Sequence, residues 1–350
     1  MVCIVIGTVL SFPAAAMTYA NVDDAVNKRT YGSYTGVGTV NIMYASSESV
    51  HDSGTCTGTL IASNVVITAA HCLRSDPNDP IVGLIFDVPS YGERTESTTF
   101  YAVVDSWQEN PAYDPADGEG GDDIGLFTLS TLATGHEVYG FYEEDPIGKE
   151  FTRVGTGSVG GPDGTGRNGV VDGFVQREGN NIYEYRESVA EPGGSYNEIW
   201  SDFDDGTDTH DVFGRVYGTS QTGIEGEHGS APGDSGAATF IDGKIVGITS
   251  GGKSGSILRD ELNCGQPTDV DPIITRSGAC TNSSVGEINV DSWVQGSMGW
   301  INSYLASATV VPEPATWLMM FIGFFATAIG LRRDARPHAA GRHAPAPSVR

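Results

Sequence analysis

Residues 56–72 read C-T-G-T-L-I-A-S-N-V-V-I-T-A-A-H-C. The run from Leu60 to Thr68 is apolar and rich in β-branched residues, a pattern that predicts a buried β-strand. The small residues after it allow a tight turn where the strand ends. His71 therefore stands where a short turn can present its imidazole ring.

A second informative stretch is G-D-S-G at residues 233–236. Gly233 and Gly236 flank Asp234 and Ser235, so the backbone can turn sharply and approach a substrate carbonyl closely. A serine hydroxyl is a weak nucleophile until a base takes its proton, and histidine has a suitable pKa for that task. Ser235 and His71 together indicate nucleophilic catalysis.

Between these two segments lies D-D-I-G-L-F-T-L, residues 122–129. An imidazole that acts as a base needs a carboxylate to hold its tautomer and to stabilise the imidazolium. Asp122 and Asp123 compete for this role, since either could be a solvated turn residue. We favour Asp123 because it directly precedes the apolar run.

These segments and their order, histidine, aspartate, serine, resemble the trypsin/chymotrypsin family of serine proteases over about residues 30–305. V-G-I-T-S-G-G at 246–252 resembles the family's substrate-binding strand, and W-I-N-S-Y-L at 300–305 its closing helix. The resemblance implies an all-β fold of two packed antiparallel six-stranded β-barrels, with a boundary near residue 150 and a C-terminal helix. The active site is expected in the cleft between the barrels.

The resemblance also implies a secreted serine endopeptidase with an acyl-enzyme intermediate. On this reading Ser235 attacks the scissile carbonyl, His71 takes and returns the proton, and Asp123 orients His71. The backbone N–H groups of Gly233 and Ser235 form the oxyanion hole. The alternative is a surface or matrix-binding protein that keeps the fold without turnover. An esterase is disfavoured because no G-x-S-x-G elbow surrounds Ser235.

Composition agrees with an all-β domain, since the chain has 47 glycines and its apolar runs are short. The exception lies near the end of the protease-like region. From Asp291 onward, Val294, Met298, Ile301 and Leu305 recur at spacings of four, three and four. This pattern predicts one amphipathic helix.

The chain is strongly acidic, with a net charge of −26. Without the segment from Ala306 it has 14 Lys and Arg against 43 Asp and Glu, a net charge of −29. We expect no nucleic-acid partner, because such a body is repelled by nucleic acid and by anionic lipid. The acids Asp202, Asp204, Asp205 and Asp208 lack the spacing of an EF-hand loop, so we assign no metal and no cofactor.

The cysteines indicate an oxidising compartment. Cys3 lies in an apolar leader that we expect to be removed. Cys56 and Cys72 match the pair that bridges beside the histidine in the family. Cys264 and Cys280 are expected to form a second disulfide across an insertion rich in Pro, Asp and Gly.

The specificity pocket departs from the trypsin pattern. The family resemblance places Gly229 at the pocket base, where an aspartate would select Arg and Lys. Ala231 stands where a cysteine usually braces the pocket. Ser250, Gly251 and Gly252 are expected to form the strand that pairs with substrate backbone. We therefore expect that the pocket does not select basic substrate side chains through an aspartate at its base.

The N-terminal region reads as a leader. Residues 1–20 combine an apolar run with small residues, as in a signal peptide. Residues 21–29 are a candidate propeptide that ends in Lys28-Arg29. The family resemblance makes Thr30 the N-terminus that cleavage would free to pair with Asp234. The competing reading is an ordinary solvated basic pair.

The C-terminal region, residues 310–333, contains Pro312-Glu313-Pro314, an uncharged run from Ala315 to Leu331, and Arg332-Arg333. As a helix the uncharged run would be about 25 Å long. The pattern resembles the PEP-CTERM sorting signal of Gram-negative bacteria, and residues 334–350 form a basic tail. It implies an exosortase partner, transient membrane anchoring, and release to the cell surface or extracellular matrix.

Overall fold

The computed structural model describes residues 17–19, 30, 32–45, 50–89, 97–103, 105–114, 121–158, 175–187, 190–191, 194–195, 197–208, 210–219, 223–224, 226–253 and 286–308. The chain divides into two compact units, residues 1–309 and 310–350, and the described residues belong to the first. Cys264, Cys280 and the run Ala315–Leu331 lie outside the described residues. No helix in the described ranges is both long and apolar enough to cross a membrane.

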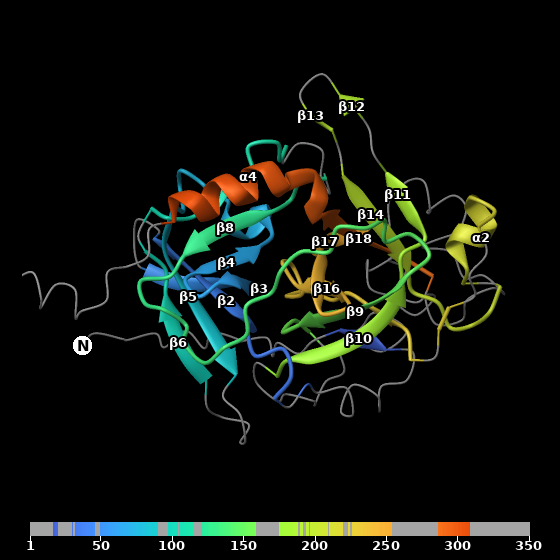
Figure 1. Cartoon of the computed structure of the whole chain (residues 1–350), viewed down its shortest axis with the longest axis horizontal. Helices are drawn as coiled ribbons and strands as arrows, with labels where there is room; N and C mark the ends of the chain where they lie inside the picture. The colour runs from blue at the N-terminus through green and yellow to red at the C-terminus, as the bar shows by residue number, and fades with distance from the viewer. Residues whose placement is uncertain are drawn as a thin grey trace, which may run out of the picture. The chain divides into compact units, whose positions relative to one another are not determined.

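The first barrel is a sheet of seven antiparallel strands in the order β6-β5-β2-β3-β4-β8-β7 (Figure 1). The strands are β2 (Val37–Ala45), β3 (Val50–Ala62), β4 (Val65–Thr68), β5 (Ile81–Pro89), β6 (Ser97–Tyr101), β7 (Gln108–Glu109) and β8 (Gly125–Thr128). The run from Leu60 to Thr68, which was predicted as one strand, belongs to two strands. Ser63 and Asn64, both turn-forming residues, separate β3 from β4.

The second barrel is also a seven-stranded antiparallel sheet, in the order β10-β9-β16-β17-β18-β14-β11. Its strands are β9 (Glu150–Gly155), β10 (Arg177–Ile182), β11 (Tyr185–Glu187), β14 (Glu198–Asp202), β16 (Ala238–Ile241), β17 (Lys244–Lys253) and β18 (Ile288–Trp293). Two short pairs accompany it, β1 (Thr18–Tyr19) with β15 (His228–Gly229), and β12 (Ala190–Glu191) with β13 (Gly194–Ser195). The short helix α2 spans Val212–Val216.

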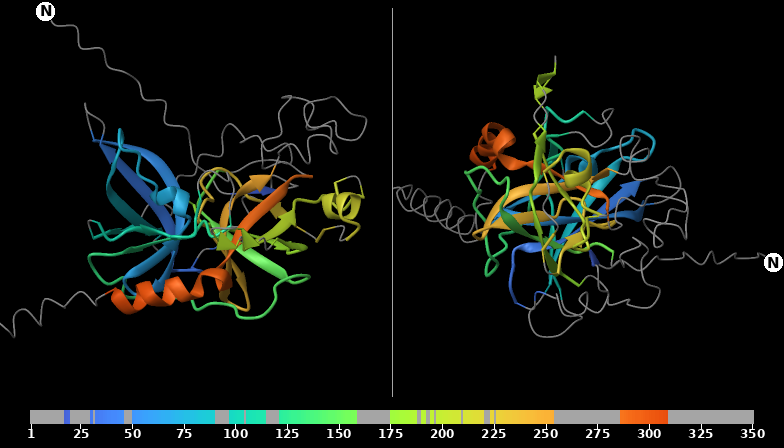
Figure 2. Two further views of the ribbon diagram at one scale, coloured as in Figure 1. Left: turned by 90° about the horizontal axis from the view of Figure 1, so that it is seen from above. Right: turned by 90° about the vertical axis from the view of Figure 1, so that its right-hand side faces the viewer.

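The two barrels share one apolar cluster. It fills the first barrel and includes Val154, Phe240 and Ile248 of the second. Helix α4 (Val294–Ser307) follows the second barrel and returns to this cluster, to which it contributes Val294 and Ile301 (Figure 2). The C-terminal helix therefore ties the end of the second barrel to the first.

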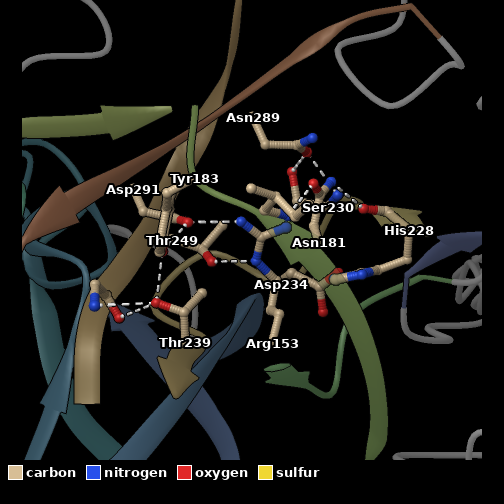
Figure 3. Close-up of polar contacts among 12 residues, drawn as sticks. Arg153, Asn181, Tyr183, His228, Ser230, Asp234, Thr239, Thr249, Asn289 and Asp291 are labelled. Carbon is tan, nitrogen blue, oxygen red and sulfur yellow. Dashed lines mark hydrogen bonds and ion pairs between the residues drawn. The ribbon is translucent and has the colours of Figure 1, made fainter. Parts of the chain in front are cut away.

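A buried ion pair crosses the second barrel (Figure 3). Arg153 Nη2 donates to both carboxylate oxygens of Asp291, at 2.9 and 2.7 Å, and neither side chain is exposed. The Nε of Arg153 donates to Thr249 Oγ1 at 2.9 Å, and the Tyr183 hydroxyl donates to Asp291 at 2.7 Å. The pair thus links β9, β17 and β18 inside the sheet.

This architecture confirms the predicted all-β fold with two antiparallel barrels and a C-terminal helix. Each sheet has one strand more than the six expected, since a short strand, β7 or β11, forms one edge. The helix begins at Val294 rather than Asp291, because Asp291 to Trp293 complete β18 in its pairing with β17.

Candidate active site

His71 lies in a single turn of 3-10 helix, η1 (Ala70–Leu73), shortly after β4. The residues of β4 and the two alanines that follow it are buried, so the turn packs directly against the sheet. A Cβ on Gly125 of β8 would lie 2.9 Å from the carbonyl oxygen of Ala69, closer than real contacts allow. The small residues therefore permit the close approach that places His71 at the end of β4.

Asp123 holds His71 through two hydrogen bonds. Its Oδ2 lies 2.6 Å from Nδ1 of the ring, and its Oδ1 accepts the backbone N–H of His71 at 2.8 Å. The Ser250 hydroxyl donates to Oδ2 at 2.6 Å, a contact that the sequence analysis missed. The carboxylate is buried, while the imidazole is about one-third exposed, at 34%. This geometry fixes the ring and leaves Nε2 to accept a proton.

The neighbouring Asp122 points elsewhere. Its Oδ1 accepts the hydroxyl of Ser297 in α4 at 2.8 Å. Burial raises the pKa of Asp122, while hydrogen bonds from Ser297 and Asn197 oppose that rise. Of the two adjacent aspartates, the one beside His71 is therefore Asp123.

Opposing effects act on the pKa of His71. Burial lowers it, because a charged ring loses hydration. The hydrogen bond and the charge of Asp123 outweigh burial, so the pKa of His71 is raised above its ordinary 6.5. The same carboxylate that orients the ring thus stabilises its protonated form.

The loop around Ser235 is hydrogen-bonded to strands of both barrels. The Ser235 carbonyl accepts the N–H of Thr57 in β3 at 2.8 Å, and the Gly236 N–H donates to Thr249 of β17 at 2.7 Å. Both glycines of G-D-S-G have positive φ, 95° at Gly233 and 82° at Gly236. A Cβ on Gly236 would collide with the Thr57 carbonyl and the Thr68 side chain, so this position requires glycine.

The segments of His71 and Ser235 lie close together. Cys56 and Cys72 form the predicted disulfide, with an S–S distance of 2.00 Å. The Cys72 sulfur lies 3.9 Å from the Ser235 carbonyl oxygen. The disulfide therefore lies against the loop of residues 233–236, and His71 directly precedes Cys72.

Asp234 is fully buried, and burial raises its pKa to about 6. Its carboxylate accepts the N–H groups of Gly157 and Ala231, each at 3.0 Å, and the backbone N–H of Met17. Thr30 lies elsewhere, with its backbone N–H 3.4 Å from the Gln176 carbonyl oxygen. Asp234 is thus hydrogen-bonded without a new chain end at Thr30.

Part of the predicted leader packs into the protein. Met17 and Tyr19 are buried, and β1 pairs Thr18 with Gly229 and Tyr19 with His228. Removal of all of residues 1–20 would therefore delete β1. A boundary just before Met17 would keep it.

The predicted specificity residues lie in two strands, β15 of the short pair beside the second barrel and β17 of the barrel itself. Gly229 is buried in β15, and Ser250, Gly251 and Gly252 lie in β17, with a register shift against β18 between Thr249 and Gly251. His228, interpreted from the sequence as a loop residue, is instead a buried strand residue. The ring fits because Gly179 of β10 has no side chain to meet it.

Comparison with protein families agrees with this geometry. The profile of the Trypsin family matches residues 36–263, and that of the PEP-CTERM protein-sorting motif matches residues 310–333. A search of curated proteins finds no match. The Trypsin profile covers well over half of the chain, and the sorting motif indicates export to the surface or exterior of a Gram-negative bacterium. The chain therefore belongs to the trypsin family and carries a PEP-CTERM sorting signal.

Proposed function

We propose that this protein is a secreted serine endopeptidase in which His71, Asp123 and Ser235 are the catalytic residues. Ser235 attacks the peptide carbonyl while His71 Nε2 accepts the hydroxyl proton, and His71 returns that proton to the leaving amine. The acyl-enzyme is then hydrolysed by water. Backbone N–H groups of Gly233 and Ser235 stabilise the oxyanion.

The observation that carries this proposal is the contact between Asp123 and His71. A buried carboxylate that binds both Nδ1 and the backbone N–H of one histidine, and also a third donor, fixes the ring and its tautomer. A histidine with only a structural role would not need that fixed orientation at the end of a strand beside a G-D-S-G loop.

Labelling with a fluorophosphonate tests the proposal, because this reagent modifies only an activated serine. The wild-type protein should be labelled, and Ser235→Ala should lose both labelling and peptide hydrolysis, the latter by at least about 10³-fold. Ser303→Ala, on the exposed side of α4, is the matched control and should behave as wild type. An unlabelled wild-type protein that binds peptides without turnover would support the matrix-binding alternative.

The pocket is proposed to take small or apolar side chains. With Gly229 at its base, a bound Arg or Lys would leave its charge without a carboxylate, which is unfavourable in a buried site. A peptide library varied at the residue before the cleaved bond measures this preference. A clear preference for Arg or Lys would contradict the assignment.

The sorting signal is proposed to anchor the protein transiently through Ala315–Leu331 until an exosortase cleaves it. Mature protein from the native host should then lack this segment, as mass spectrometry of the exported protein would show. Recovery of peptides from residues 334–350 with the mature protein would instead indicate a permanent anchor.

A further inference from the structure

The interior of the second barrel holds more negative than positive side chains. From Glu150 onward, the described residues include ten buried charged side chains, of which eight are carboxyls and two are arginines. The carboxyls are Glu198, Asp202, Asp204, Asp211, Glu227, Asp234, Glu287 and Asp291. Arg153 pairs with Asp291, and the carboxyls of this set outnumber its arginines eight to two.

Three of these carboxyls, those of Asp202, Asp204 and Glu227, lie close together in the structure. Asp202 ends β14, Asp204 follows it, and Glu227 directly precedes β15. Each offers a carboxylate oxygen, and these oxygens all lie within 4.8 Å of one another. The three residues are 1%, 2% and 3% exposed. Water therefore does little to screen their repulsion.

Asp204 is the least satisfied of the three. Asp202 accepts the N–H of Val212 at 2.7 Å, and Glu227 accepts the N–H groups of Asp204 and Ile224 at 2.8 and 2.9 Å. Neither carboxylate oxygen of Asp204 has a hydrogen-bond partner among the described residues. An unpartnered buried carboxyl that faces two others is a strong acceptor for a cation.

We propose that Asp202, Asp204 and Glu227 form a calcium site. Calcium binds six to eight oxygen ligands at 2.3–2.6 Å, so oxygens that share one ion lie no more than about 5 Å apart. The three carboxylates meet this condition. Glu184 lies beside the cluster, since its carboxyl is hydrogen-bonded to Asp202 and its Oε1 has no partner among the described residues.

The ion would join two segments that are distant in the sequence. One is the end of β14, and the other leads from Glu227 through β15 to the nucleophile loop. Asn181 already bridges the same segments, since its Nδ2 donates to the Asp202 carbonyl at 2.6 Å and to the His228 carbonyl at 3.1 Å, the second of these residues being labelled in Figure 3. Calcium is therefore expected to stabilise the fold close to the proposed pocket.

Calcium titration of the full mature protein tests the site, in a Ser235→Ala background that prevents self-digestion. After treatment with EDTA, calorimetry should detect one tight site for Ca²⁺, and Tm should rise by about 5 °C at roughly 100 times Kd. Mg²⁺ should produce a smaller shift, because it demands a tighter octahedral arrangement. An equal response to Mg²⁺ would overturn the assignment to calcium.

Asp204→Asn distinguishes a ligand from a merely structural acid. The substitution removes a ligand charge but also relieves repulsion, so without calcium the variant should be at least as stable as the parent. It should lose at least about tenfold in calcium affinity. Asp208→Asn, an exposed acid of the same loop, is the matched control and should bind as the parent does. No calcium binding by the parent, or equal losses in both variants, would overturn the proposal.

Discussion

The two barrels share a strand arrangement but differ in what their interiors contain. Among the described residues, the first barrel and the loops that follow it bury two charged side chains, Asp122 and Asp123, both at or beside the proposed site. The second barrel and its loops bury ten. Where the structure describes its residues, the apolar side chains beyond the shared cluster include smaller groups around Phe151 and around Phe213. The first barrel is thus held mainly by apolar packing, and the second also by buried ionic and polar contacts.

The largest effect is expected from breaking the buried ion pair of the second barrel. Asp291→Ala leaves Arg153 buried without its partner, and such a loss typically costs about 3–5 kcal/mol. Denaturant unfolding measures the change in the free energy of unfolding. Glu144→Ala breaks the exposed pair with Lys149 and should leave stability almost unchanged. A similarly small effect for Asp291→Ala would contradict this account of the second barrel.

The corresponding test of the first barrel is a substitution that shortens a buried apolar side chain. Leu60 is fully buried, so Leu60→Ala should lower the free energy of unfolding by about 2–5 kcal/mol. Val82→Ala, at a position 41% exposed in β5 of the same barrel, is the control and should have a small effect. The loss at Leu60 should persist at high salt, because it does not arise from charge. A loss that disappeared at high salt would show that the barrels do not differ as described.

The pH profile tests the proposed catalytic role of the contact between Asp123 and His71. Asp123 raises the pKa of His71, and only neutral His71 can accept a proton. The kcat/KM should therefore rise with pH, with a midpoint above 6.5. An NMR titration of the ring should give a lower pKa in Asp123→Asn, because burial then acts without that charge. An unchanged pKa in the variant would contradict the role of Asp123.

The smallest effect is expected at the predicted activation site. Asp234 accepts hydrogen bonds from Ala231, Gly157 and Met17, while the Thr30 N–H lies at the Gln176 carbonyl. Arg29→Gln should therefore leave kcat/KM unchanged, as measured with a peptide substrate. A folded but nearly inactive Arg29→Gln protein would show that cleavage before Thr30 is required.

The sequence predicted what depends on local pattern. The turn at His71 and the glycines around Ser235 are encoded in short segments, and the helix in a spacing of three and four residues. The disulfide between Cys56 and Cys72 was predicted from the family resemblance. The sequence favoured Asp123 over Asp122 as the partner of His71, as the structure has it, but it could not show that Ser297 in α4 binds Asp122. It also could not show that Asp202, Asp204 and Glu227 converge, because strand pairing brings distant segments together.

Helix α4 also affects when, during synthesis of the chain, the first barrel can finish folding. Because the chain is made from its N-terminus, the strands of the first barrel exist before α4 does. Val294 and Ile301 nevertheless belong to the core of those strands, and Ser297 holds the residue next to Asp123. The first barrel can therefore finish folding only after the chain has been synthesised as far as α4, which ends at Ser307. The proposed active site would then be complete only shortly before the sorting motif at 310–333 is synthesised.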